Sequence, residues 1–139
     1  MTIDIEQIRP ELTWRLRQQV LYPAQKLSEM ELEEDGNGWH FGAFNDNDLV
    51  GVVSLFKHGD AFQFRKLAVA EGAQRMGVGS KLLDYITGFA IQEGAQKIWC
   101  NARTTAINFY LKAGFIQTGE LFFKNGFDYE IMEKTLITI

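Results

Sequence analysis

The glycine-rich segment at residues 74–80 has the residue types and spacing that hold a phosphate group. It reads Gln-Arg-Met-Gly-Val-Gly-Ser, between the apolar run 67–70 and an amphipathic stretch, which predicts a strand, a turn and a helix start. The first N–H groups of a helix lack intrahelical partners and lie at the positive end of the macrodipole, so they stabilise an anion. Gly77 and Gly79 would let the anion approach the backbone, and Gln74 and Arg75 would add side-chain donors.

Two familiar phosphate-binding loops do not match this segment. A P-loop needs Gly-Lys followed by Ser or Thr, whereas residues 79–81 read Gly-Ser-Lys. A dinucleotide-binding loop needs a small residue three positions after the second glycine and an acidic residue about 20 positions further on. Here Leu82 takes the first position, and Ile98 and Trp99 stand near the second.

The segment does resemble the Gln/Arg-x-x-Gly-x-Gly/Ala motif of the GNAT acetyltransferases. A second block, residues 106–115, reads AINFYLKAGF and is similar to the A-x-x-F-Y-x-K-x-G-F signature of that family. Residues 16–21 and 40–44 also resemble front-half segments of small GNAT proteins. The resemblance implies the GNAT acyl-CoA N-acyltransferase fold and transfer of an acetyl group from acetyl-CoA to a primary amine of a small molecule or peptide, within one ternary complex.

In the family, the tyrosine of the second block lies near the sulfur of coenzyme A, and the matching residue is Tyr110. A tyrosine with a pKa of ~10 can protonate a thiolate with a pKa of ~8.5, because the transfer is uphill by only ~1.5 units. From the residues alone, a buried tyrosine on a short amphipathic helix is more often part of the core.

Other parts of the chain are candidates for binding the rest of the coenzyme. Backbone amides from Arg75 to Ser80 would hold the pyrophosphate, and the pantetheine arm would pair with the strand edge at 67–69. Asn101 and Asn108 offer amide donors and acceptors, although turn and capping roles compete. Many family members have asparagine seven positions before the tyrosine, where this chain has Arg103. The predicted coenzyme residues are Leu67, Ala68, Val69, Gln74, Arg75, Met76, Gly77, Val78, Gly79, Ser80, Asn101, Asn108 and Tyr110.

The proton of the acceptor ammonium needs a base, since an alkyl amine has a lysine-like pKa of ~10.4. Glu71 follows the predicted coenzyme strand and is the first candidate, with Glu29, Glu31 and Glu33 behind it. Each of these is also explained as an ordinary surface acid. The wider acidic run at 29–35 reads most simply as a solvated stretch, with an amine-receiving surface as the alternative.

Composition favours one soluble domain spanning 1–139. Hydrophobic residues make up 46% of the 139, and the formal net charge is −4, which argues against nucleic acid and suits a cationic substrate. No signal-peptide core or membrane span is evident, so we expect a cytoplasmic protein with no membrane partner. Cys100 lies in an apolar run and reads as a buried hydrophobe rather than a nucleophile. No metal-binding pattern occurs, so no metal cofactor is expected.

Periodicity predicts a mixed α/β protein with a central, mostly antiparallel sheet of six to seven strands and helices on both faces. Asn125-Gly126 predicts a type I′ hairpin turn between the last two strands. Helices are expected after Pro10 with Leu12, Leu16 and Val20 on one face, over 80–93 with Gly94 ending the helix, and over 104–113. The expected strands are 2–8, 39–44, 49–56, 62–69, 96–101, 115–124 and 127–137.

Two other functions compete with an enzyme. A non-catalytic acyl-CoA-binding or regulatory module would keep the glycine turn without needing a working Tyr110. An interaction domain that has lost its ligand is the other alternative, and the intact glycines argue against it. Residues 22–38 and the terminal hairpin around Phe122 and Phe123 are expected to shape the acceptor pocket. Exposed aromatic residues on the last strands could instead mediate a homodimer.

Overall fold

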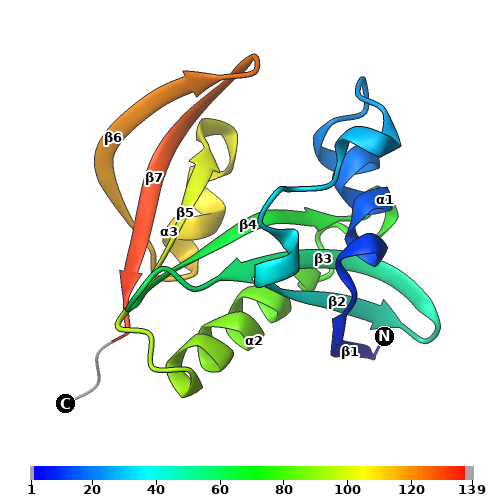
Figure 1. Cartoon of the computed structure of the whole chain (residues 1–139), viewed down its shortest axis with the longest axis horizontal. Helices are drawn as coiled ribbons and strands as arrows, with labels where there is room; N and C mark the ends of the chain where they lie inside the picture. Colours follow the sequence, from blue (N-terminus) through cyan, green and yellow to red (C-terminus); the bar gives the residue numbers. More distant parts are fainter. Residues whose placement is uncertain (1, 137–139) are drawn as a thin grey trace. The chain divides into compact units, whose positions relative to one another are not determined.

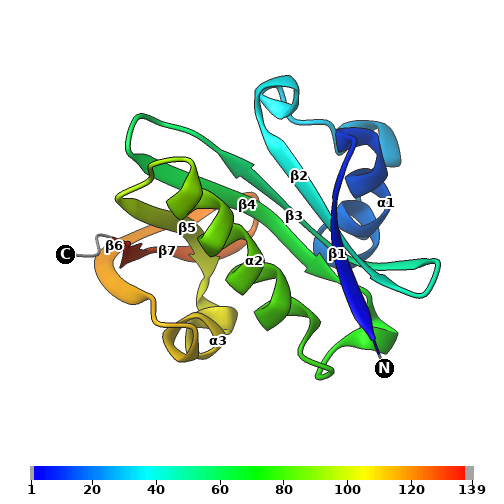
Figure 2. The same ribbon diagram turned by 90° about the horizontal axis from the view of Figure 1, so that it is seen from below.

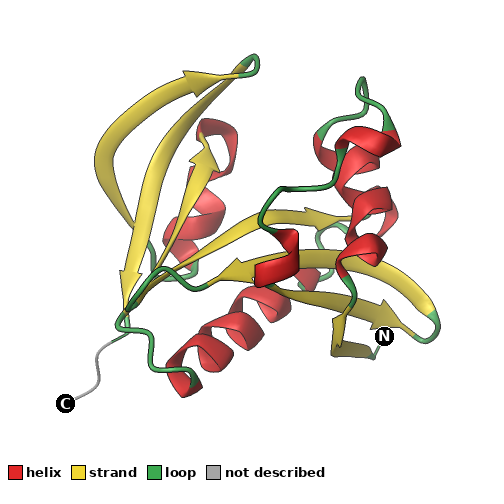
Figure 3. Cartoon of the chain, viewed as in Figure 1, coloured by secondary structure: helices red, strands yellow, loops and turns green. Residues whose placement is uncertain are grey.

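A computed structural model describes residues 2–136, which form seven strands and three α-helices joined by short helical turns (Figures 1 and 3). The strands are β1 (Ile3–Ile8), β2 (Trp39–Asn45), β3 (Asp48–Phe56), β4 (Ala61–Val69), β5 (Lys97–Arg103), β6 (Ile116–Lys124) and β7 (Phe127–Thr135). The helices are α1 (Trp14–Leu16), α2 (Val78–Gln92) and α3 (Ile107–Lys112).

The strand order β1-β2-β3-β4-β5-β7-β6 defines a mixed sheet. The pairs β1–β2, β2–β3, β5–β7 and β6–β7 are antiparallel, while β4 and β5 are parallel. The predicted mixed, mostly antiparallel sheet is therefore confirmed. The predicted last strand ran to Ile137, which lies outside the described residues.

The chain divides into two compact units. The first comprises Met1–Phe56 and Phe64–Ile86, and the second comprises Lys57–Gln63 and Thr87–Ile139. Strand β4 and helix α2 each contribute residues to both units. That residues 1–139 form a single domain stays a prediction.

Helices cover both faces of the sheet in the first unit, as Figure 2 shows for α1 and the first turns of α2. On one face, Leu16 is buried against Val52 and Ala68. On the other face, an ideal Cβ added to Gly51 would lie 2.9 Å from Val78, so α2 packs closely on β3. Alternation along β3 sends neighbouring residues to opposite faces, and the sheet therefore has an apolar core on each side.

The helical segment after Pro10 is less regular than its apolar spacing predicts. It begins with a 3-10 turn at Pro10–Thr13, continues as α1 and ends as a π-helical turn at Arg17–Leu21. Because these turns differ in residues per turn, a stripe at α-helical spacing does not stay on one face. Leu16 is buried, but Leu12 is 40% exposed, so the predicted apolar face is wrong at Leu12.

The apolar stripe predicted for α2 is confirmed, since its four residues are all buried: Leu82, Leu83, Ile86 and Ala90. It starts two residues earlier than the predicted 80–93. Gly94, at a φ of 89°, adopts the left-handed conformation typical of the residue that ends a helix.

In the second unit, β7 lies between β5 and β6. Asn125 and Gly126, with φ angles of 51° and 87°, connect β6 to β7 and match the predicted type I′ turn. Ile98, Cys100 and Ala102 are buried on one face of β5, and the intervening residues belong to the other face. Figure 1 shows α3 beside β5.

Among residues 2–136, no helix is both long enough and apolar enough to cross a membrane.

Candidate active site

The segment between β4 and α2 contains two residues in the left-handed region, separated by a single residue. Arg75 and Gly77 have φ angles of 70° and 79°, whereas Met76 between them does not have a positive φ and Val78 begins the helix. Left-handed residues next to right-handed ones can turn successive N–H groups toward one side, an arrangement known as an anion-binding nest. Binding of phosphate by this segment stays a prediction.

The start of α2 adds further N–H donors to this turn. The first hydrogen bond of the helix runs from Lys81 N to Gly77 O, at 3.0 Å. The N–H groups of Val78, Gly79 and Ser80 belong to the first turn, which has no intrahelical acceptor for them. An ideal Cβ on Gly77 would meet no atom within 4 Å, so the space beside the turn is open. Free N–H groups at a helix start are a common anion-binding arrangement.

The side chain of Gln74 connects the turn to the end of β4. Its Nε2 donates a hydrogen bond to the carbonyl oxygen of Val69, at 3.1 Å. Gln74 therefore positions the turn, and its predicted contact with phosphate stays a prediction. Arg75 and Met76 are exposed, so their side chains are accessible to a ligand.

Residues 67–69, which we expect to bind pantetheine, follow a break in the regular strand. Lys66 has a φ of 59°, which is unusual within a strand and typical of a bulge. The parallel pairs of β4 with β5 run from Ala61↔Lys97 to Gln63↔Trp99, and Leu67 to Val69 lie beyond them. The Nζ of Lys66 contacts the phenol oxygen of Tyr22 and lies 4.5 Å from the centroid of that ring.

Tyr110 is 9% exposed and lies among aromatic side chains of the second unit. Its ring centroid is 5.1 Å from that of Phe109 and 5.9 Å from that of Phe115. Burial raises the pKa of Tyr110, with a smaller contribution in the same direction from Cys100, while the charge of Arg103 lowers it. The net pKa is above the ordinary value. The transfer of a proton from Tyr110 to a thiolate is therefore further uphill than the ~1.5 units that ordinary pKa values give.

Arg103 occupies the position where many GNAT proteins have asparagine. Its guanidinium carbon lies 3.7 Å from the centroid of the Phe127 ring, a cation–π contact between β5 and the start of β7. Of the two predicted amide ligands, Asn101 is exposed on β5, on the face opposite Cys100, and Asn108 is exposed on α3.

Cys100 is 2% exposed, and burial raises the pKa of its thiol to about 12. A thiolate is the reactive form of cysteine, so this environment disfavours nucleophilic chemistry. The prediction of a buried, unreactive cysteine agrees with this environment.

The acidic run contains a buried ion pair that the sequence analysis missed. Asp35 is 4% exposed and Arg17 is 1% exposed. Arg17 Nη1 and Nη2 donate to Asp35 Oδ2 and Oδ1, at 2.8 and 3.0 Å. Describing the whole run as solvated was therefore wrong at Asp35, because Arg17 supplies the charge that makes its burial tolerable.

Polar groups around this ion pair extend it into a network in the first unit. Arg17 Nη2 also donates to Ser54 Oγ at 2.9 Å, and Ser54 Oγ lies 2.7 Å from His40 Nδ1. His40 Nε2 lies 2.8 Å from the carbonyl oxygen of Asp35, which can only accept, so Nε2 carries a proton. The network joins the segment around Asp35 to strands β2 and β3.

The candidate bases are solvent-exposed. Glu71 opens a 3-10 turn, Glu71–Ala73, directly after β4, and its side chain is exposed. Glu29, Glu31 and Glu33 are exposed as well. An exposed carboxylate can accept a proton from a bound amine and release it to water. Within the described part of the chain, no group of three or more His, Cys, Asp and Glu side chains could hold a metal ion.

A family model described as an acetyltransferase (GNAT) domain matches residues 6–136. The chain belongs to the GNAT acetyltransferase family. A curated relative, described as the uncharacterized N-acetyltransferase YitI of Bacillus subtilis (strain 168), is 30% identical over 146 residues, which cover 98% of each chain. This GNAT chain is thus related over 98% of its length to a protein named as an N-acetyltransferase.

Solved structures share the fold of this GNAT chain. An IAA acetyltransferase from Bacillus cereus ATCC 14579 has a TM-score of 0.80 at 21% identity, covering 97% of this chain and 100% of its own. A GNAT family acetyltransferase from Elizabethkingia anophelis with acetyl-CoA bound has a TM-score of 0.75 at 20% identity, covering 96% and 98%. The GNAT acyl-CoA N-acyltransferase fold predicted from the two motifs is confirmed.

Proposed function

We propose that this GNAT acetyltransferase transfers the acetyl group of acetyl-CoA to a primary amine of a small molecule or peptide, within one ternary complex. The observation that carries the proposal is the turn before α2, which has positive φ angles at Arg75 and Gly77 and leads directly into the helix N-terminus at Val78. Family membership and a relative solved with acetyl-CoA bound support the choice of coenzyme.

Acetyl-CoA supplies an activated thioester, and the residues of this chain must bind it and move two protons. We assign the pyrophosphate to the backbone N–H groups of residues 75–80, and the pantetheine amides to the backbone at 67–69, with Asn101 and Asn108 as further partners. The space beside Gly77 and the free first turn of α2 support the phosphate assignment.

The new bond joins the amine nitrogen to the acetyl carbon while the bond from that carbon to sulfur breaks. The acceptor ammonium loses one proton to become a nucleophile and a second as the amide forms, while one proton must reach the sulfur. We assign the ammonium proton to the carboxylate of Glu71 and the proton that reaches the sulfur to the hydroxyl of Tyr110, while the second nitrogen proton is released to water. The signature in residues 106–115 supports Tyr110, while the raised pKa makes its hydroxyl a weak acid and suits it to donating a hydrogen bond as the sulfur becomes negative.

We also retain a homodimer and a cytoplasmic location as proposals. Strand β6 lies at the edge of the sheet, where Leu121 is 68% exposed and Phe123 is 69% exposed. Exposed apolar side chains on an edge strand are a common element of interfaces. Sedimentation equilibrium of the wild type and of a Leu121→Glu variant tests the dimer, which would dissociate in the variant.

The test of the proposed function is calorimetric titration with acetyl-CoA and with desulfo-CoA. We expect both to bind the wild type and neither to bind Gly77→Glu, whose side chain would fill the nest with negative charge. Gly59→Glu is the matched control, because Gly59 also has a positive φ, 64°, with no atom within 4 Å of an added Cβ. Absence of binding to the wild type would overturn the proposal. Binding without turnover on any amine would indicate a non-catalytic acyl-CoA-binding module.

A further inference from the structure

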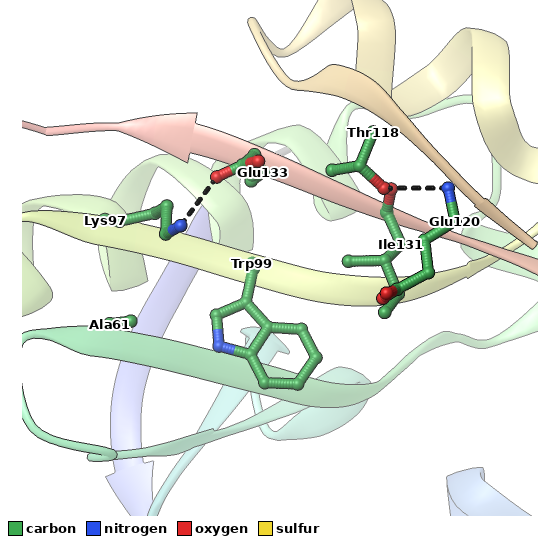
Figure 4. A pocket seen from close by; sticks show the side chains of 7 residues that line it. All are labelled: Ala61, Lys97, Trp99, Thr118, Glu120, Ile131 and Glu133. Atoms are coloured by element: carbon green, nitrogen blue, oxygen red, sulfur yellow. Dashed lines mark hydrogen bonds and ion pairs between the residues drawn. The ribbon is translucent and has the colours of Figure 1, made fainter.

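The second unit carries a pocket on the face of β5 opposite Cys100 (Figure 4). Its volume is about 430 Å³, and it is a shallow site that is open to solvent. Residues of β4, β5, β6 and β7 line it: Ala61, Lys97, Trp99, Thr118, Glu120, Ile131 and Glu133.

The lining combines a flat aromatic surface with carboxylates. Trp99 and Ile131 are partly buried and form an apolar part of the wall. Lys97 Nζ lies 2.8 Å from Glu133 Oε2, so these two charges neutralise each other. The third charged group, Glu120, is exposed. The lining therefore has one net negative charge, beside an indole ring.

The position of Glu120 is set by a bulge in β6. The register with β7 shifts between Gln117 and Leu121, and Gly119 has a φ of 81°. The N–H of Gly119 donates to Glu130 Oε2 at 2.9 Å, and Gln117 Nε2 donates to Glu130 Oε1 at 3.0 Å. Glu130 is 5% exposed, so a buried carboxylate holds the bulge in place.

Thr118 closes the bulge from the other side. Its hydroxyl donates to the carbonyl oxygen of Ile131 at 2.7 Å and accepts from the N–H of Glu120 at 3.2 Å, as the dashed line in Figure 4 marks for the second bond. The backbone from which the Glu120 side chain extends is therefore fixed before any ligand arrives, which lowers the entropic cost of binding.

We infer that this pocket binds a small organic cation, an ammonium group carried on a short alkyl chain. The indole of Trp99 attracts a cation through its ring face, Ile131 contacts the alkyl chain, and the carboxylate of Glu120 supplies the opposite charge. The carboxylate of Glu120 would repel an anion, and Lys97 would not offset this repulsion because it already forms an ion pair with Glu133. This binding goes beyond the proposed function, since it requires neither acetyl-CoA nor transfer.

The test is NMR titration of ¹⁵N-labelled protein with n-butylammonium chloride, read at the indole N–H resonance that a Trp99→Phe variant assigns. We expect a saturable shift with n-butylammonium, and none with 1-butanol or with sodium chloride at the same ionic strength. Glu120→Gln, which keeps the shape of the side chain, should weaken binding by about threefold to tenfold. Glu93→Gln, which changes an exposed carboxylate outside the pocket lining, should leave binding unchanged.

Three results would overturn the inference: no saturable shift in the wild type, equal shifts with 1-butanol, or equal affinity in Glu120→Gln and wild type. Because Glu120 is exposed, its replacement leaves the fold intact, and the dispersion of the remaining resonances verifies this. The titration contains no coenzyme and measures no turnover, so its failure is distinct from failure of the transferase proposal.

Discussion

The guanidinium of Arg17 forms two parallel hydrogen bonds with the carboxylate of Asp35, at 2.8 and 3.0 Å, and both side chains are buried. Arg17 Nη1 also donates to the carbonyl oxygen of Met30 at 2.9 Å, and the N–H of Leu32 donates to Asp35 Oδ2 at 2.9 Å. The pair thus helps to fix the segment between the first helix and β2, which otherwise consists of isolated turns and short 3-10 helices.

We expect Arg17→Met to reduce the free energy of unfolding by about 3–5 kcal/mol, because it leaves a buried carboxylate without its partner. Urea denaturation followed by circular dichroism measures the change. Arg9→Met is the control, since Arg9 is exposed and should change stability by less than about 0.5 kcal/mol. Equal stability of Arg17→Met and wild type would show that the pair does not hold this segment.

The same pair predicts a loss of stability in acid. Burial alone raises the pKa of Asp35, but hydrogen bonds from Arg17 and Leu32 and the charge of Arg17 outweigh it, so the pKa lies below the ordinary 3.8. A carboxyl with a depressed pKa in the folded state stabilises the fold above its unfolded pKa. This stability is lost as pH falls through the lower, folded-state pKa.

The unfolding free energies of wild type and Asp35→Asn, compared from neutral pH to the lowest pH at which both fold, test this pH dependence. We expect the difference in unfolding free energy between them to be constant at neutral pH and to narrow below pH 3.8. A difference that widens on acidification would contradict the depressed pKa.

Gly77 combines a positive φ with open space, and two substitutions separate these properties. Gly77→Ala should cost about 1–2 kcal/mol of stability, whereas Gly77→Asn should cost less, because asparagine tolerates the left-handed conformation. Both should weaken acetyl-CoA binding by calorimetry, since each places a side chain beside the nest. Wild-type affinity in Gly77→Ala would remove this turn from the phosphate site.

Tyr110→Phe removes only a hydroxyl from a packed ring. If Tyr110 assists the departure of sulfur, the turnover number falls by about 10²-fold or more while the affinity for acetyl-CoA is unchanged. Tyr85→Phe, on the exposed side of α2, is the matched control and should keep wild-type turnover. Full turnover in Tyr110→Phe would return Tyr110 to a purely structural role.

The raised pKa of Tyr110 also predicts how the turnover of the wild type depends on pH in the alkaline range. A donor works in its protonated form, so a higher pKa moves its loss of activity to higher pH. We expect no loss of turnover from Tyr110 ionisation below pH ~10, its ordinary pKa. A decline near pH 8 that Tyr110→Phe abolishes would contradict this.

Cys100 should be unreactive in the folded protein, because burial raises the pKa of its thiol to about 12. Iodoacetamide at pH 8 should label it only after denaturation, as mass spectrometry would show. Cys100→Ala should retain acetyl transfer, although it leaves a small cavity. Rapid labelling of the folded protein would show that Cys100 is accessible.

The sequence predicted the features that depend on local chemistry. Asn125-Gly126 forms the expected turn because few other residue pairs adopt two positive φ angles. The stripe at Leu82, Leu83, Ile86 and Ala90 is buried because a regular α-helix preserves a 3.6-residue spacing. The glycine turn and the block at 106–115 placed the chain in its family, since each motif depends on residues that are close together in the chain.

Contacts between residues far apart in the chain were decided only by the tertiary structure. The sequence pattern indicated that Asp35 was one of several surface acids. Its burial depends on Arg17, 18 residues earlier, which also donates a hydrogen bond to Ser54. The pKa of Tyr110 depends on a packed environment from β5 and α3, which ordinary pKa values do not include. The pocket beside Trp99 needs four strands in register and a bulge held by Glu130. Local propensity fixes the elements, whereas burial and charge pairing depend on the complete set of neighbours.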